Sequence, residues 1–113
     1  MVLTREFKTT VKERAGRDPA FAEALLGEAI DLLLDGDVST GKLILRDYIN
    51  ATTGFGDLAV RTGTPAKSLM RMLSAAGNPR ANNLFAVVRA LKDATGVQLS
   101  VTTHRQGENF QAE

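Results

Sequence analysis

The side chains best suited to chemistry lie between Phe55 and Pro79, where hydrogen-bond donors recur at helical spacing. Lys67 and Arg71 are four residues apart, so a helix would present both on one face. Such cations bind phosphate oxygens, and they can also bond O6 and N7 of guanine in the major groove of DNA. Thr64 and Ser68 add short hydroxyl donors near the start of the same helix. The pattern favours contact with nucleic acid.

The composition argues against an enzyme. The chain has no cysteine and a single histidine, His104, which excludes disulfides and thiolate metal sites. A Ser-His-Asp triad would depend on that one residue in a polar tail. The pair Asp35 and Asp37 flanks a glycine in a turn, and the remaining ligands of a calcium loop are missing. No nucleophile motif or phosphate loop occurs, so we predict neither catalysis nor a cofactor.

Two short helices joined by a tight turn are predicted to hold the donors. The first spans residues 55–62, and Gly63 ends it because glycine adopts a left-handed backbone at little steric cost. Thr64 is the predicted N-cap of the second helix, with Pro65 as its first residue. That helix runs to about residue 73. Its predicted buried face, opposite Lys67 and Arg71, consists of Leu69, Met72 and Leu73.

Further predicted contacts lie in the loop before the next helix, which is rich in turn-forming residues. Asn78 and Arg80 flank the start of that helix, where they could meet phosphate groups or serve only as turn residues. The complete set of predicted DNA-binding residues is Thr64, Ala66, Lys67, Ser68, Arg71, Asn78 and Arg80.

Caps, glycines and apolar spacing predict an all-α fold. The expected helices span residues 4–15, 18–34, 39–53, 55–62, 64–73 and 81–95. Gly16 is expected to end the first of them, and Asp18 to cap the second. In the helix over 39–53, the side chains expected in the core are Leu43, Ile44 and Tyr48.

The segment Val97–Thr102 alternates apolar and polar residues and predicts a short strand. A lone strand cannot satisfy its own backbone groups, so a second copy of the chain is the expected partner. We therefore predict a homodimer, which would use Leu99, Val101 and the leucines at 32–34. From His104 onward the tail is polar, and we expect it to be disordered.

The chain resembles the helix-turn-helix of lambda-repressor-like DNA-binding domains. Within that class it is similar to HigA-type addiction-module antidote proteins and prophage-type regulators. The residues that carry the resemblance are Leu58-Ala59, Gly63, Ser68-Leu69, Leu73-Ser74, Gly77-Asn78-Pro79, Leu84, Val88, Leu91 and Val97-Gln98-Leu99. Gly56 departs from it, because many such domains carry a polar residue there that touches phosphate.

The resemblance implies a five-helix DNA-binding domain over residues 39–103. Residues 1–38 would form an N-terminal helical extension and residues 104–113 a tail, in one compact unit. The implied function is that of a sequence-specific DNA-binding transcriptional regulator acting as a homodimer. The alternative is the antidote of a toxin–antitoxin module, which neutralises a small protein toxin and represses its own operon.

Charge and hydropathy agree with these expectations. Acidic residues outnumber basic ones before Gly54, and basic residues outnumber acidic ones after it, although the net charge is only +1. A DNA-binding half is expected to be the basic half. No apolar run is long enough to cross a membrane, and the charged start lacks the apolar stretch of a secretory signal. We expect a cytoplasmic protein without a membrane partner.

Overall fold

The computed structural model describes the backbone of residues 5–105 and the side chains of residues 11–105. Every regular element in the described part of the chain is an α-helix, so the prediction of an all-α fold is confirmed. The helices are α1 (Arg5–Arg17), α2 (Pro19–Leu34), α3 (Val38–Ala51), α4 (Phe55–Thr62), α5 (Ala66–Met72) and α6 (Ala81–Thr95). None of these described helices has the length and apolar character that a membrane span requires.

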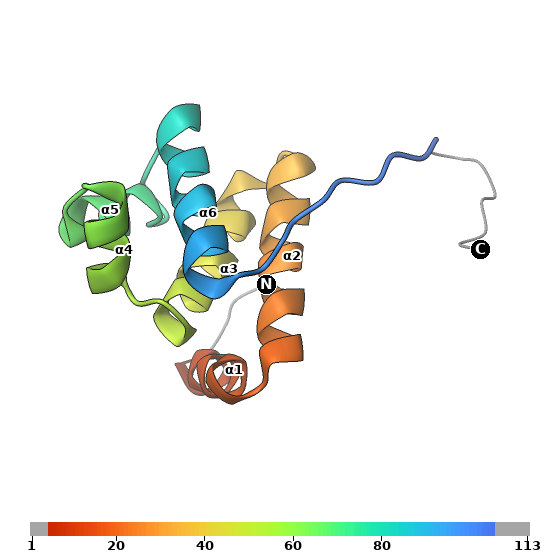
Figure 1. The fold of residues 1–113 in the computed structure, drawn as a ribbon, viewed down its shortest axis with the longest axis horizontal. Helices are drawn as coiled ribbons and strands as arrows, with labels where there is room; N and C mark the ends of the chain where they lie inside the picture. The colour runs from red at the N-terminus through yellow and green to blue at the C-terminus, as the bar shows by residue number, and fades with distance from the viewer. Residues whose placement is uncertain (1–4, 106–113) are drawn as a thin grey trace.

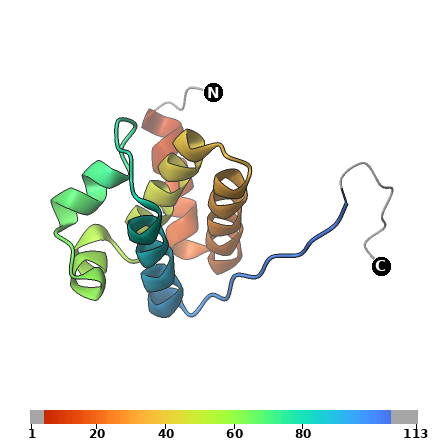
Figure 2. The same cartoon turned by 90° about the horizontal axis from the view of Figure 1, so that it is seen from above.

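Two groups of helices share one core (Figure 1). Helices α1 and α2 pack against each other and against α3, whereas α4 packs against α5 and α6. Figure 2 shows the α4–α5 pair at one end of the molecule and the segment after α6 leaving on the other side. The largest fully buried side chains belong to one cluster: Leu26, Leu45, Tyr48, Ile49, Leu58, Leu69, Leu73, Val87 and Leu91. Burying each of them contributes roughly 1.5–3 kcal/mol, which holds the two groups together.

Side-chain caps fix the starts of α2 and α3. Asp18 Oδ1 accepts a hydrogen bond from the Phe21 N–H at 3.2 Å, as the sequence predicts. Asp37 Oδ1 accepts one from the Thr40 N–H at 3.2 Å, so α3 begins one residue earlier than predicted. The prediction that Gly16 ends the first helix is wrong. It lies inside α1, because the Asp18 N–H still donates to the carbonyl four residues earlier.

The buried face of α3 differs from the predicted one. Of the three expected core residues, Tyr48 is fully buried, whereas Leu43 and Ile44 are only half-buried. The face that meets the core consists of Gly41, Lys42, Leu45, Tyr48 and Ile49. The helix is rotated relative to the prediction because a lysine, Lys42, lies on its inner side.

The predicted C-terminal strand is not formed, and that prediction is wrong. Residues 97–105 belong to no β-ladder. Val97 and Leu99 still pack against the core while Gln98 and Ser100 are exposed, so the alternation is present without strand pairing. A strand requires a second strand, and the described part of a single chain supplies none. The tail expected to be disordered lies, from residue 106 onward, outside the described residues.

Residues 39–103 contain four described helices, α3 to α6, where the resemblance implies five. The described chain after α6 is extended from Val97 and forms no further helix. The preceding helices α1 and α2 are both packed on α3. The part expected to be an N-terminal extension therefore belongs to the same core.

The loop between α5 and α6 closes tightly onto the end of α5. The Gly77 N–H donates to the Ser74 carbonyl oxygen at 3.0 Å. A Cβ atom at Gly77 would overlap the carbonyl oxygens of Arg71 and Met72. Both are backbone atoms of α5 and cannot turn aside as a flexible side chain could. The close approach therefore requires glycine at this position.

Replacing Gly77 with alanine should destabilise the protein by about 1–3 kcal/mol, because the overlap forces the loop away from α5. Gly56→Ala is the matched control, since a Cβ at Gly56 meets nothing within 4 Å. Alanine inside α4 should instead stabilise by about 0.5–1 kcal/mol. Urea unfolding followed by circular dichroism measures both variants. Equal stabilities would contradict the packing described for Gly77.

Candidate nucleic-acid interface

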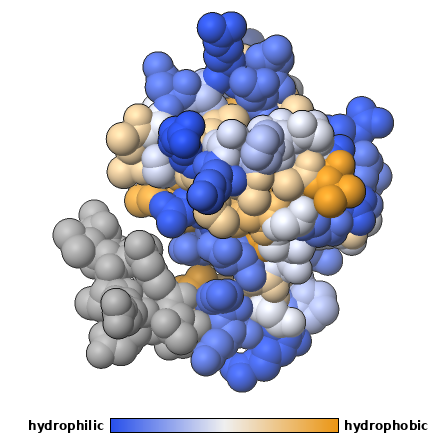
Figure 3. All heavy atoms as spheres, turned by 90° about the vertical axis from the view of Figure 1, so that its left-hand side faces the viewer, coloured by the Kyte–Doolittle hydropathy of each residue, from blue (hydrophilic) through white to orange (hydrophobic). Residues whose placement is uncertain are grey.

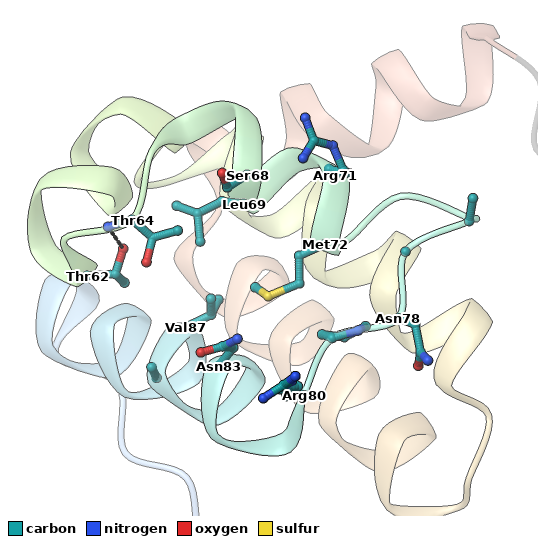
Figure 4. A pocket seen from close by; sticks show the side chains of 14 residues that line it. Thr62, Thr64, Ser68, Leu69, Arg71, Met72, Asn78, Arg80, Asn83 and Val87 are labelled. Carbon is teal, nitrogen blue, oxygen red and sulfur yellow. Dashed lines mark hydrogen bonds between the residues drawn. The ribbon is translucent and has the colours of Figure 1, made fainter.

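A three-residue turn, residues 63–65, joins α4 to α5. Gly63 ends α4 with a left-handed backbone (φ 71°, ψ 17°), as predicted, and its N–H donates to the Ala59 carbonyl oxygen at 2.9 Å. Thr62 Oγ1 donates to the Leu58 carbonyl oxygen at 2.9 Å. It also accepts the Thr64 N–H at 3.2 Å (Figure 4). These bonds satisfy backbone polar groups at the end of α4 that have no partner within the helix. They also fix the path of the chain into α5.

The start of α5 differs from the prediction. Pro65, rather than Thr64, is the N-cap, because its ψ of 144° is non-helical and its carbonyl oxygen accepts the first helical bond, from the Leu69 N–H at 3.1 Å. The helix begins at Ala66, and no side chain caps it. The Thr64 N–H is instead held by Thr62. The Thr64 hydroxyl is therefore left to face the groove beside α5.

Opposite faces of α5 meet the core and the solvent. Leu69 is buried and Met72 is half-buried against the core, as predicted. Lys67 and Arg71 are exposed on the outer face. Ala66 is half-buried and packs against the core, which gives it a packing role in this structure.

A groove of about 480 Å³ lies between α5, the following loop and the start of α6 (Figure 4). The apolar side chains of Leu69, Met72 and Val87 form part of its lining. Figure 4 shows Arg71 on the α5 side and Arg80 on the α6 side. The predicted contact residues that line the groove are Thr64, Ser68, Arg71, Asn78 and Arg80. The structure thus brings together most of the predicted set, while Ala66 and Lys67 lie outside the groove.

Asn83 is a groove residue that the sequence prediction missed. It is exposed in the first turn of α6, and its side chain lies in the groove near Met72 (Figure 4). An amide both donates and accepts hydrogen bonds, so it can meet a phosphate or a base edge. The available signal was its place three residues after Arg80, one helical turn into α6.

A buried lysine holds the loop that carries Asn78 and Arg80. Lys42, on α3, is only 3% exposed. Its Nζ donates to the Ser74 carbonyl oxygen at 2.9 Å and to the Gly77 carbonyl oxygen at 2.6 Å. These bonds attach the loop to the centre of the molecule and place it beside α5.

Carbonyl dipoles compensate the Lys42 charge. Within the described residues it forms no ion pair, and its partners are carbonyl oxygens just beyond the C-terminal end of α5, where a helix concentrates negative potential. The sequence prediction gave Lys42 no role. A signal was present, because Lys42 stands three residues before Leu45 and seven before Ile49, the spacing of a single helix face.

Basic side chains around the site fall into two groups. Arg61 Nε lies 3.2 Å from Asp57 Oδ2, and Arg89 Nε lies 3.4 Å from Asp93 Oδ2, each pair within one helix. Between residues 55 and 96, the exposed basic residues without an ion pair to the described chain are Lys67, Arg71 and Arg80. Figure 3 faces the end formed by α4 and α5 and shows mainly hydrophilic side chains with small apolar patches between them. Cations that no carboxylate neutralises attract phosphate.

Comparison of the chain with protein-family models, curated proteins and solved structures finds no match. Among the residues with described side chains, no group of three or more His, Cys, Asp or Glu could hold a metal ion.

Replacing Lys42 with methionine should destabilise the protein by about 1–3 kcal/mol, because methionine fills a similar volume but leaves the Gly77 carbonyl oxygen without its donor and the Ser74 carbonyl oxygen with only the Gly77 N–H. Lys12→Met, on an exposed position of α1, makes the same chemical change and should shift stability by less than about 0.5 kcal/mol. Urea unfolding measures the difference between the two variants. A Lys42→Met protein as stable as the control would contradict the anchoring role.

Proposed function

We propose that this protein binds double-stranded DNA sequence-specifically, with α4 and α5 acting as a helix-turn-helix and α5 lying in the major groove. The observation that carries the proposal is the set of exposed cations on α5 and at the start of α6 that lack ion pairs to the described chain, whereas Arg61 and Arg89 are paired within their own helices. The left-handed turn at Gly63 supports a lambda-repressor-like arrangement of this pair. DNA is a polyanion that such a surface fits.

Lys67 and Arg71 take the base-reading role. They lie on the outer face of α5, opposite the buried Leu69, so the helix can enter a groove about 12 Å wide without disturbing the core. Arginine bonds guanine O6 and N7 with two parallel hydrogen bonds, and lysine can bond the same edge. Ser68, at the margin of the groove, adds a short hydroxyl that can reach a base or a phosphate.

Donors on either side of α5 take the phosphates. Thr64 precedes the helix, and Asn78 and Arg80 follow it, so contacts to the backbone would flank the base-reading side chains. Phosphate contacts of this kind fix orientation and register without reading sequence. Lys42 contributes indirectly, because it holds the loop that carries the second group.

Occupying an operator in this way would make the protein a transcriptional regulator, such as a repressor. Neutralisation of a protein toxin stays a prediction from the resemblance. Toxin neutralisation can be tested separately from DNA binding, since a toxin would form a stable complex with the protein in the absence of DNA.

Replacing Arg80 with alanine should weaken binding to all duplexes alike and lower the slope of log K against log salt by about one, because one phosphate contact is lost. Lys67→Ala or Arg71→Ala should cost about 1–3 kcal/mol on the preferred sequence and relax the preference at one base pair. Fluorescence anisotropy with labelled duplexes over a range of salt concentrations measures both effects. Because all three side chains are exposed, each substitution should change the free energy of unfolding by only about 0.5 kcal/mol.

Arg89→Ala is the matched control. It removes the same charge from an exposed position on α6, but there the guanidinium group is paired with Asp93. Its affinity and salt dependence should equal those of the wild type. If Arg89→Ala weakens binding as much as Arg80→Ala, net charge alone would explain the affinity and the assigned face would be wrong.

A further inference from the structure

Met70 is the exposed member of the three large apolar side chains on α5. Its relative exposure is 46%, whereas Leu69 is buried and Met72 is half-buried against the core. Packing of the core therefore does not explain an apolar residue at position 70. A single exposed apolar side chain is ordinary on a protein surface, so its neighbours must indicate whether it has a role.

Two cations lie near Met70 on the surface of α5. Lys67 stands three residues before Met70, and Arg71 stands four residues after Lys67; both are exposed without an ion pair to the described chain. Side chains three residues apart on a helix have Cβ atoms about 5–6 Å apart. Ser68 and Arg71 line the groove beside α5, but Met70 does not, so it lies on the flank of the helix away from that groove.

Two parallel rows therefore run along the outer surface of α5. The basic row consists of Lys67 and Arg71 and the apolar row of Ala66 and Met70, each with a spacing of four residues. Ala66 is half-buried against the core, so Met70 is the member of the apolar row that projects from the surface. Its unbranched thioether side chain is flexible enough to adapt to an irregular apolar surface.

The major groove of DNA presents a matching pair of features. Guanine offers O6 and N7 as acceptors for a cation, and thymine offers its C5-methyl group as an apolar contact. No other unmodified base of DNA carries a methyl group at the edge of this groove. Contact between that methyl group and an apolar side chain is favourable because it removes both from water.

We propose that Met70 contacts the C5-methyl group of a thymine in the bound DNA, beside a guanine that Lys67 or Arg71 binds. The inference rests on the proposed function and names a residue that determines its specificity. Cβ atoms about 5–6 Å apart span less than two base steps of about 3.4 Å, so the thymine and the guanine lie within about two base pairs of each other. Cytosine lacks the methyl group, so Met70 discriminates between the two pyrimidines.

Duplexes with deoxyuridine in place of thymidine test the contact, because uracil keeps the pairing groups of thymine and lacks only its methyl group. The probe is the duplex that the wild type selects from a random library, with its thymines replaced one at a time. Fluorescence anisotropy at fixed salt measures the dissociation constants. At one position the wild type should bind the uracil duplex about fourfold more weakly, since one methyl group loses its apolar contact.

Met70→Gln removes the apolar end of the side chain at similar length and should bind the thymine and uracil duplexes equally. Met70→Leu should keep the discrimination, because leucine is also apolar and of similar volume. Leu34→Gln is the matched control and should keep the wild-type ratio. Leu34 is 61% exposed on α2, which lies on the opposite side of the molecule from α5 (Figures 1 and 2). All three positions are exposed in the same way, so helical circular dichroism should be unchanged.

Three results would overturn the contact while leaving DNA binding intact. They are a selected motif with no thymine near a guanine, equal binding of the wild type to every thymine and uracil duplex, and a Met70→Gln protein that keeps the wild-type ratio. A wild type that selects no motif would instead refute the DNA-binding proposal, and the Met70 contact with it. The failures of the two proposals are therefore distinguishable.

Discussion

The hydrogen bonds from the Lys42 ammonium group to the Ser74 and Gly77 carbonyl oxygens join the two sides of the candidate interface. Helix α5 has only seven residues, and a helix of that length is not stable by itself. Its position depends on burial of Leu69 on one side and on the loop that closes its end. Hydrogen bonds with an ionised donor are shorter and stronger than neutral ones, and the bond to Gly77 is 2.6 Å long. The position of Arg80 relative to α5 therefore depends on a residue of α3.

The basic side chains around the groove are either bonded within the chain or exposed without an ion pair to the described chain. Lys42 is buried and bonded to the backbone, while Arg61 and Arg89 are paired within their own helices. Lys67, Arg71 and Arg80 lie exposed on or beside α5 without an ion pair to the described chain, so this part of the surface is more positive than the net charge of +1 suggests. The slope of log K against log salt scales with the number of phosphate contacts, so an interface with few cations is expected to bind DNA with only a shallow dependence on salt. In this account specificity comes from side chains on α5 and affinity from the donors that flank it.

The sequence predicted elements whose determinants are local. Asp18 caps α2, Gly63 ends α4, and Leu69 lies on the inner face of α5, because capping geometry, left-handed backbone and helical spacing act over a few residues. The inner face of α3 was predicted only in part: Tyr48 is buried and Ile44 packs against the core, but Lys42 was missed, since its acceptors come from the distant Ser74–Gly77 loop. The strand failed for a related reason, because strand pairing needs a partner outside the described chain. Asn83 lines the groove because α6 packs on α4 and its first turn faces α5 across the groove, a placement that depends on tertiary packing.

Selection of bound duplexes from a random library is the most direct test of the claim that α5 reads DNA sequence. It should be performed with the purified wild type and with a Lys67→Ala/Arg71→Ala double variant. The account predicts that the wild type enriches one sequence motif and that the double variant, though folded, loses the enrichment. A wild type that enriches no motif, or a double variant that selects the same motif with the same strength, would contradict it.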